Sequence, residues 1–135
     1  MLFRSSNIRI RGYHVDLFGH VNNARFLEFL EEARWQLLDN HIGLESIREG
    51  RFVLAVVNIN INYRKPVLFN QSIELWAGMD SISRRSAIIR QEIRFAGTSD
   101  VACDALVTFV VADPKTGAAL SLESGPAREW LDKLS

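Results

Sequence analysis

The sequence predicts an α+β fold in which an antiparallel sheet wraps one long helix. One stretch near the start has apolar residues at helical spacing, and four later stretches alternate apolar and polar residues with turn-forming residues between them. Consecutive strands of this kind pair into an antiparallel sheet with one apolar face, and the helix is the natural cover for that face. A plain α+β sandwich fits the same pattern, because periodicity alone does not fix how far a sheet curls.

The long helix is predicted to begin at Asn22 or Asn23, since either residue is a good N-cap, and to stop near Gly43. At the usual rise it is about four or five turns long. Its apolar stripe is broad and contains Phe26, Leu30, Ala33 and Leu37. These side chains are therefore the predicted centre of the core.

Strands are predicted on both sides of this helix in the chain. One runs from Asn7 to Val15, where Ile8 and Ile10 alternate with arginines. The other four cover residues 53–63, 72–83, 86–95 and 101–111, with turn sequences between them. Pro126 then opens a short C-terminal helix.

Composition limits the classes of protein to consider. The chain has 135 residues, 47% of them hydrophobic, which suits one globular domain over residues 1–135 that folds without a cofactor or metal. Its 16 Lys and Arg balance 16 Asp and Glu, so no overall positive field draws it to nucleic acid or an anionic membrane. No apolar run is long enough to span a bilayer and no signal peptide is recognisable, so the expected location is cytoplasmic. Cys103, the single cysteine, is expected to pack in the core.

The stretch from Asp16 to Phe26 contains the best candidates for chemistry. A carboxylate follows a predicted strand, a turn with Gly19 comes next, and a helix then begins with backbone N–H groups that lack intrahelical partners. Those N–H groups can stabilise negative charge on a carbonyl oxygen, while the carboxylate can attack the carbonyl carbon or activate a water. By pattern alone, however, an Asp before a helix is more often a turn or cap residue than a catalyst.

This stretch resembles the active-site motif of the 4-hydroxybenzoyl-CoA thioesterase-like branch of hotdog proteins. Further blocks resemble bacterial long-chain acyl-CoA thioesterase III almost from end to end: Arg11–His14, His20–Trp35, Val56–Pro66 and Ala105–Phe109. Several long blocks are more specific than one short motif. The resemblance implies the hotdog fold, in which the sheet wraps one central helix, and hydrolysis of acyl-CoA, especially long-chain fatty acyl-CoA, to free acid and CoA.

By position, the resemblance implies that Asp16 is the catalytic carboxylate, as nucleophile or general base, and that the backbone N–H of Asn23 polarises the thioester carbonyl. His20 is a further candidate for acid–base work, although a core or cap role is at least as compatible with the pattern. Two other functions stay open: a dehydratase or hydratase of 3-hydroxyacyl thioesters, and a catalytically silent acyl-CoA-binding module. The dehydratase chemistry usually needs a His with a carboxylate, whereas the motif here resembles the thioesterase one.

Several polar residues are candidates for substrate binding. Asn58 and Asn60 alternate with apolar residues and so share one strand face, which either lines a polar groove or is solvated. Two basic pairs at strand ends could meet the phosphates of CoA or be merely solvated: Arg64 with Lys65, and Arg84 with Arg85.

Two further expectations concern assembly and the acyl group. Exposed strand edges invite pairing with another copy, and the resemblance implies a homodimer or homotetramer with active sites at the subunit junction. The apolar residues in and after the motif predict an apolar acyl pocket that is lined by the helix and by the inner face of the sheet. On the helix, Glu31 and Arg34 stand three positions apart and are expected to pair with each other.

Overall fold

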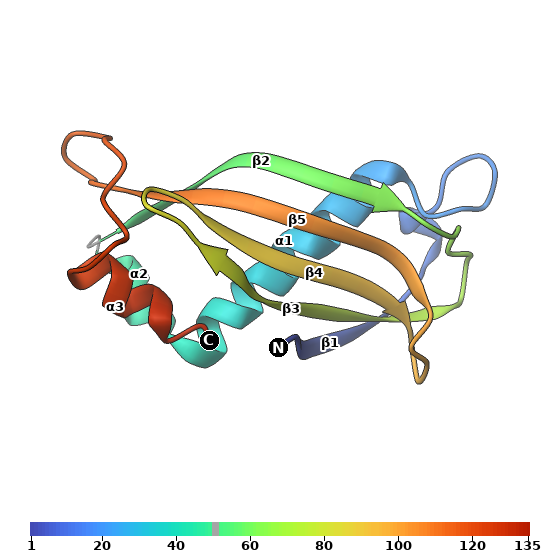
Figure 1. Cartoon of the computed structure of the whole chain (residues 1–135). Coiled ribbons are helices and arrows are strands. Elements are labelled where there is room, and N and C mark those ends of the chain that lie inside the picture. Colours follow the sequence, from blue (N-terminus) through green and yellow to red (C-terminus); the bar gives the residue numbers. More distant parts are fainter. Residues whose placement is uncertain (50–51) are drawn as a thin grey trace.

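The computed structural model describes residues 1–49 and 52–135. In these residues an antiparallel sheet of five strands, in the order β1-β3-β4-β5-β2, curves over the long helix α1 (Figure 1). The strands are β1 (Phe3–Arg9), β2 (Val53–Tyr63), β3 (Ser72–Ile82), β4 (Ala87–Phe95) and β5 (Val101–Ala112). The helices are η1 (Gly12–His14), α1 (Asn23–His41), α2 (Leu44–Arg48) and α3 (Pro126–Asp132). The predicted α+β class with a wrapped helix is confirmed.

Helix α1 begins and ends where the sequence predicts. The Asn22 side chain accepts a hydrogen bond from the Ala24 N–H at 2.8 Å and so caps the first turn. After His41 the chain reaches Gly43, whose φ of 90° lies in the left-handed region and ends the helix. Among the described helices, none has the length and apolarity of a membrane span.

The core lies between α1 and the concave face of the sheet. Leu30 and Ala33 of α1 are buried against a face that includes Leu75 of β3, Ile93 of β4 and Val107 of β5. Leu75 pairs with Ile93 in the β3–β4 register, so apolar side chains from neighbouring strands meet on the same side. Cys103 is also buried in this core, as predicted.

The first predicted strand is partly wrong. The sequence predicts it over Asn7–Val15, whereas β1 ends at Arg9 and a short 3-10 helix follows. Two local hydrogen bonds account for the change: the His14 N–H donates to the Arg11 carbonyl at 3.0 Å, and the Arg11 N–H donates to Nδ1 of His14 at 2.8 Å. These bonds turn the chain towards α1 before an extended strand can continue.

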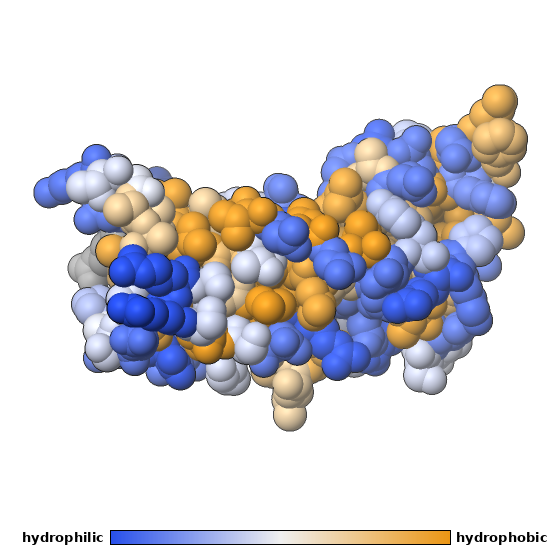
Figure 2. All heavy atoms as spheres, turned by 45° about the horizontal axis from the view of Figure 1, so that its top comes forward, coloured by the Kyte–Doolittle hydropathy of each residue, from blue (hydrophilic) through white to orange (hydrophobic). Residues whose placement is uncertain are grey.

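Strand β2 forms one edge of the sheet and is unusually apolar on the surface. It pairs with β5 on one side, with a register shift between Val56 and Asn58. Val57 is 58% exposed, and Val56, Ile59 and Tyr63 are also exposed. Figure 2 shows this side of the molecule as a hollow with apolar atoms along its floor, between two projecting ends. An apolar strand edge of this kind favours pairing with another chain.

Candidate active site

Asp16 lies in a tight hairpin formed by Val15–Val21, which we call the Asp16 hairpin. Val15 and Val21 form an antiparallel bridge, and the Asp16 N–H donates to the His20 carbonyl at 2.8 Å. Gly19 has a φ of 77° and its N–H donates to the Asp16 carbonyl at 3.0 Å. A residue without Cβ is favoured there, which explains the glycine in the motif.

The hairpin fixes one oxygen of the Asp16 carboxylate and leaves the other available. Oδ1 accepts from the Phe18 N–H at 2.9 Å and from the His20 N–H at 3.4 Å. In the part of the chain that the structure describes, Oδ2 has no hydrogen-bond partner, and the side chain is exposed. Asp16 is therefore a turn residue through one oxygen and can act as a base or nucleophile through the other.

The first turn of α1 presents one free backbone donor. The N–H of Ala24 is capped by Asn22, and the N–H groups of Arg25 and Phe26 donate to the Asn22 carbonyl at 2.9 and 3.4 Å. Within residues 1–49 and 52–135 the N–H of Asn23 has no acceptor. A donor at a helix N-terminus can stabilise an oxyanion, so Asn23 suits the role that the resemblance implies.

Tyr63 ties this helix start to the edge strand. Its hydroxyl donates to the Asn23 carbonyl at 3.3 Å, and its ring contacts Phe26 with the ring centroids 5.5 Å apart. Partial burial raises the pKa of Tyr63, so the phenol keeps its proton and its role as donor. The end of β2 and the free N–H of Asn23 are thereby held together, a contact that sequence spacing does not reveal.

His20 lies beside Asp16 but is neither a core residue nor the helix cap. Its imidazole is exposed and has no hydrogen bond among the described residues, while its backbone closes the hairpin and bridges to Leu68. His20 therefore has neither of the two structural roles that the sequence leaves open, since its side chain is exposed and Asn22 caps the helix. A role in acid–base chemistry stays a prediction.

His14 supports the chain on both sides of the Asp16 hairpin, a role that the sequence pattern does not indicate. It is buried, its ring lies between Tyr13 and Phe29 at centroid distances of 4.2 and 5.3 Å, and its carbonyl accepts from the Asn22 N–H at 3.0 Å. Burial, followed by the positive charge of Arg25, lowers the pKa of His14. A neutral imidazole can accept from the Arg11 N–H, so the neutral form holds the turn that leads into the Asp16 hairpin.

The neutral His14 should make the stability of the protein depend on pH. Because the folded-state pKa of His14 is below the unfolded value of about 6.5, the stability it contributes is present above that pH and is lost as pH falls towards the folded-state pKa. We expect the melting temperature of the native protein to fall between about pH 7.5 and about pH 5.5. The variant His14→Asn, whose Oδ1 can replace Nδ1 as acceptor, should show a smaller fall. Parallel curves for the two proteins would contradict this assignment.

The predicted asparagine row does not lie near Asp16. Asn58 pairs with Thr108 and Asn60 with Leu106, while the intervening Ile59 pairs with buried Val107 of the concave face. The asparagines therefore face the convex side of the sheet, away from α1. On this side Asn60 lines a polar hollow of about 430 Å³ with Arg64 and Asp104, so the polar groove that the sequence leaves open is present. It lies on the face away from α1, and the structure does not join Asn58 or Asn60 to the catalytic candidates.

The four basic candidates all carry contacts of their own. Arg64 pairs with Asp104 and Lys65 with Asp100, both at 2.7 Å. Arg84 lies 3.6 Å from Glu123, and Arg85 donates to the Ala119 carbonyl at 3.4 Å. Arg84 and Arg85 lie in the β3–β4 turn, at the opposite end of the molecule from the Asp16 hairpin (Figure 1). Their contact with CoA phosphates stays a prediction, and any such contact must compete with these partners.

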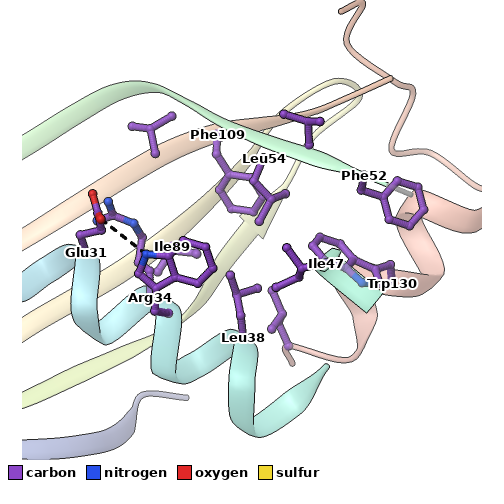
Figure 3. A pocket seen from close by; sticks show the side chains of 13 residues that line it. Glu31, Arg34, Leu38, Ile47, Phe52, Leu54, Ile89, Phe109 and Trp130 are labelled. Atoms are coloured by element: carbon purple, nitrogen blue, oxygen red, sulfur yellow. Dashed lines mark hydrogen bonds between the residues drawn. The ribbon is translucent and has the colours of Figure 1, made fainter. Parts of the chain in front are cut away.

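A pocket of about 480 Å³ lies at the far end of α1 from Asp16 (Figure 3). We call it the α1–β2 pocket, because side chains from the second half of α1 face the first residues of β2 across it. Leu38 of α1 and Leu54 of β2 form its sides, Phe109 of β5 lies at its back, and Trp130 of α3 closes one end. The pocket is mainly apolar, so it suits a hydrocarbon chain.

Two charged residues line the other end of the pocket, and they do not form the predicted pair. Arg34 donates to Oε1 of the fully buried Gln91 at 3.0 Å, and Gln91 donates to the Leu30 carbonyl at 2.9 Å. Glu31 instead accepts from Nε1 of Trp35 at 3.4 Å. Burial lowers the pKa of Arg34, although the charge of Glu31 partly offsets that effect. The predicted pairing of Glu31 with Arg34 is therefore wrong, because the Arg34 guanidinium binds the buried Gln91 amide instead.

The single chain separates its two functional parts. Asp16 and Asn23 lie before and at the start of α1, whereas Trp35 and Leu38 line the pocket near its end. Asn23 and Trp35 are about 18 Å apart along α1 at the usual rise per residue.

A sheet wrapped around one helix, with a carboxylate hairpin beside a free helix N-terminus, defines the thioesterase class of hotdog proteins. The chain belongs to the thioesterase-like superfamily, whose model matches residues 10–133. It is 43% identical over 129 residues to the long-chain acyl-CoA thioesterase FadM of Escherichia coli, with 96% of this chain and 97% of that protein covered.

Solved structures agree with this membership. The probable thioesterase YbaW from Escherichia coli superposes with a TM-score of 0.87 at 43% identity, over 96% of both chains. A 1,4-dihydroxy-2-naphthoyl-CoA thioesterase from Synechocystis superposes with a TM-score of 0.81 at 19% identity, over 99% of this chain and 98% of that one. The second likeness shows the fold alone.

Proposed function

We propose that this protein hydrolyses long-chain acyl-CoA to free fatty acid and CoA, with Asp16 as the catalytic carboxylate. The observation that carries the proposal is that, among the described residues, Asp16 keeps one carboxylate oxygen without a partner and the N–H of Asn23, at the nearby start of α1, has no acceptor. The 43% identity to a long-chain acyl-CoA thioesterase supports the same substrate class.

Two routes use these groups. In the first, Asp16 takes a proton from water, the resulting hydroxide forms a bond to the thioester carbon, and the oxyanion accepts a hydrogen bond from the Asn23 N–H. The carbon–sulfur bond then breaks, and the proton on Asp16 passes to the departing CoA thiolate. In the second, Asp16 itself attacks the carbon, the thiolate leaves, and water hydrolyses the anhydride that forms. Both routes need the same carboxylate.

The active site is completed by a second copy of the chain, paired through β2. The strand begins at Val53, which lines the α1–β2 pocket, and ends at Tyr63, which contacts Asn23. If two β2 edges pair antiparallel about a twofold axis, the start of one strand lies beside the end of the other. The pocket of one protomer then adjoins the Asp16 hairpin of its partner. A homodimer is the smallest assembly with this property, and a tetramer of two such dimers has it as well.

The substrate class is tested with a panel of acyl-CoAs and a thiol reagent that reports free CoA. Each methylene buried in the α1–β2 pocket contributes about 0.8 kcal/mol, so kcat/KM should rise by up to about fourfold per methylene until the pocket is full. Long acyl chains should exceed acetyl and benzoyl substrates. A preference for acetyl or benzoyl thioesters would contradict the long-chain assignment but would leave the assignment of thioesterase activity standing.

The same panel distinguishes the two other functions. A dehydratase or hydratase would change an unsaturated or 3-hydroxyacyl thioester without releasing CoA. A silent binding module would hold acyl-CoA without converting it. Either result would overturn the proposed hydrolysis.

A further inference from the structure

We propose that Leu17 and Phe18, at the tip of the Asp16 hairpin, close the mouth of the partner protomer's α1–β2 pocket and thereby set the acyl-chain preference. This inference rests on the proposed function and on the dimer through β2. It adds a role for two residues that neither the catalytic chemistry nor the core of a single chain requires.

The first observation is the exposure of the tip. Leu17 is 94% exposed and Phe18 is 80% exposed, although both side chains are large and apolar. The backbone beneath them is fixed, because the Phe18 N–H donates to Oδ1 of Asp16 at 2.9 Å and the Gly19 N–H closes the turn. Two adjacent apolar side chains on a rigid, projecting turn form a surface suited to bury against another apolar surface.

The second observation is the open side of the α1–β2 pocket. Trp35 of α1 and Val53 and Val56 of β2 line it and are themselves exposed. The mouth of the pocket is thus apolar and uncovered, and it is formed by the strand that carries the unpaired edge. A fatty acyl chain in this pocket would keep one side in water unless another apolar group covered it.

The topology decides which group can cover it. Strand β2 has 11 residues, so its two ends lie about 33 Å apart, and the tip of one protomer does not reach its own pocket. Antiparallel pairing of two β2 edges places the Tyr63 end of one beside the Val53 end of the other, and the Asp16 hairpin adjoins the Tyr63 end through Asn23. Figure 2 shows the apolar hollow of one protomer lying between two projecting ends. The occupant of the pocket mouth is therefore the tip of the second copy.

This arrangement couples selectivity to catalysis. The Phe18 N–H binds the same carboxylate that performs the chemistry, so the tip and Asp16 move as one unit. A long acyl chain that fills the partner's pocket buries more apolar area beneath the tip than a short chain does, so the tip stabilises long chains more. Leu17 and Phe18 are thus specificity residues that touch the acyl chain and take no part in bond breaking.

Cross-linking tests the contact directly. Phe18→Cys and Val53→Cys are introduced together, and a short bis-maleimide is added to the dimeric protein. Burial raises the pKa of the native Cys103 thiol to about 12, so it does not react. We expect a covalent dimer from the double variant and from a mixture of the two single variants, and none from Phe18→Cys alone. No covalent dimer from a double variant that is dimeric and still releases CoA would overturn the inference and leave the proposed function standing.

Steady-state kinetics tests whether Leu17 and Phe18 set the acyl-chain preference. Leu17→Ser with Phe18→Ser should lower kcat/KM for hexadecanoyl-CoA by about tenfold and change the value for butanoyl-CoA by less than about twofold. The matched control is Leu68→Ser with Phe69→Ser, which removes two apolar side chains that are 43% and 58% exposed on the neighbouring loop. The control should leave the chain-length profile unchanged. Equal losses on both substrates, or an equal effect of the control, would overturn the specificity role.

Discussion

Replacing Asp16 with Asn is expected to lower kcat by at least about 100-fold, or roughly 2.7 kcal/mol of barrier, with little change in KM. The amide oxygen of Asn can still accept from the Phe18 N–H, so the hairpin should persist, but an amide is neither a nucleophile nor a base. Release of free CoA from hexadecanoyl-CoA measures the loss, and the melting temperature shows that the fold is retained. Asn23→Ala should cost much less, because the backbone N–H survives the change.

Asp113→Asn is the matched control for this substitution. Oδ1 of Asp113 accepts from the Lys115 N–H at 2.7 Å and from the Thr116 N–H at 3.4 Å, which is the same kind of turn that Asp16 makes. Asp113 follows β5 and is expected to be replaceable without loss of activity. A loss below about tenfold for Asp16→Asn, or an equal loss for the control, would remove Asp16 from the chemistry.

Val57→Lys is expected to produce a monomer that has lost most of its activity on long-chain acyl-CoA. Val57 is 58% exposed on the open edge of β2, so a lysine fits the isolated chain but places a charge in the proposed interface. Light scattering at micromolar concentration gives the mass, and CoA release gives the activity. The activity should fall with the dimer, because in the proposed assembly the Asp16 of one protomer serves the α1–β2 pocket of the other.

Leu106→Lys is the control for the edge. Leu106 is likewise an exposed apolar residue, but it lies on β5, which has a neighbouring strand on each side. This variant should keep the β2-paired dimer and its activity. A Val57→Lys protein that is monomeric and fully active would show that one chain holds a complete site.

The periodic parts of the fold could be predicted from the sequence because local spacing determines them. Helix α1 and strands β3 to β5 begin and end within about two residues of the predicted positions, which is the ordinary uncertainty of such boundaries. Strand β1 was misplaced because the alternation of Ile8 and Ile10 continues past the point where the side chain of His14 turns the backbone. A side chain that bonds to its own backbone leaves no trace in a hydrophobic pattern.

In the candidate site, too, the sequence predicts what lies within one segment but not which distant segments come together. The position of Asp16 and the start of α1 follow from the motif, since both lie in one short segment. The row with Asn58 has period two, which predicts a shared face, but the period does not tell that this face lies on the far side of the sheet from Asp16. Gln91, which binds Arg34, is 57 positions away in the chain, and the α1–β2 pocket joins segments that only the fold brings together.

Sharing of each active site between two protomers is tested most directly by mixing two inactive variants. Asp16→Asn removes the carboxylate and keeps the pocket, while Leu54→Trp fills the α1–β2 pocket and keeps the carboxylate. In a mixed dimer, one site combines both lesions and the other combines the intact Asp16 with the intact pocket. After random exchange of subunits, activity on hexadecanoyl-CoA should recover to about a quarter of the native value, since half of the dimers are mixed and each has one intact site. A mixture that exchanges subunits and stays inactive would show that Asp16 and the pocket that serves it belong to the same chain.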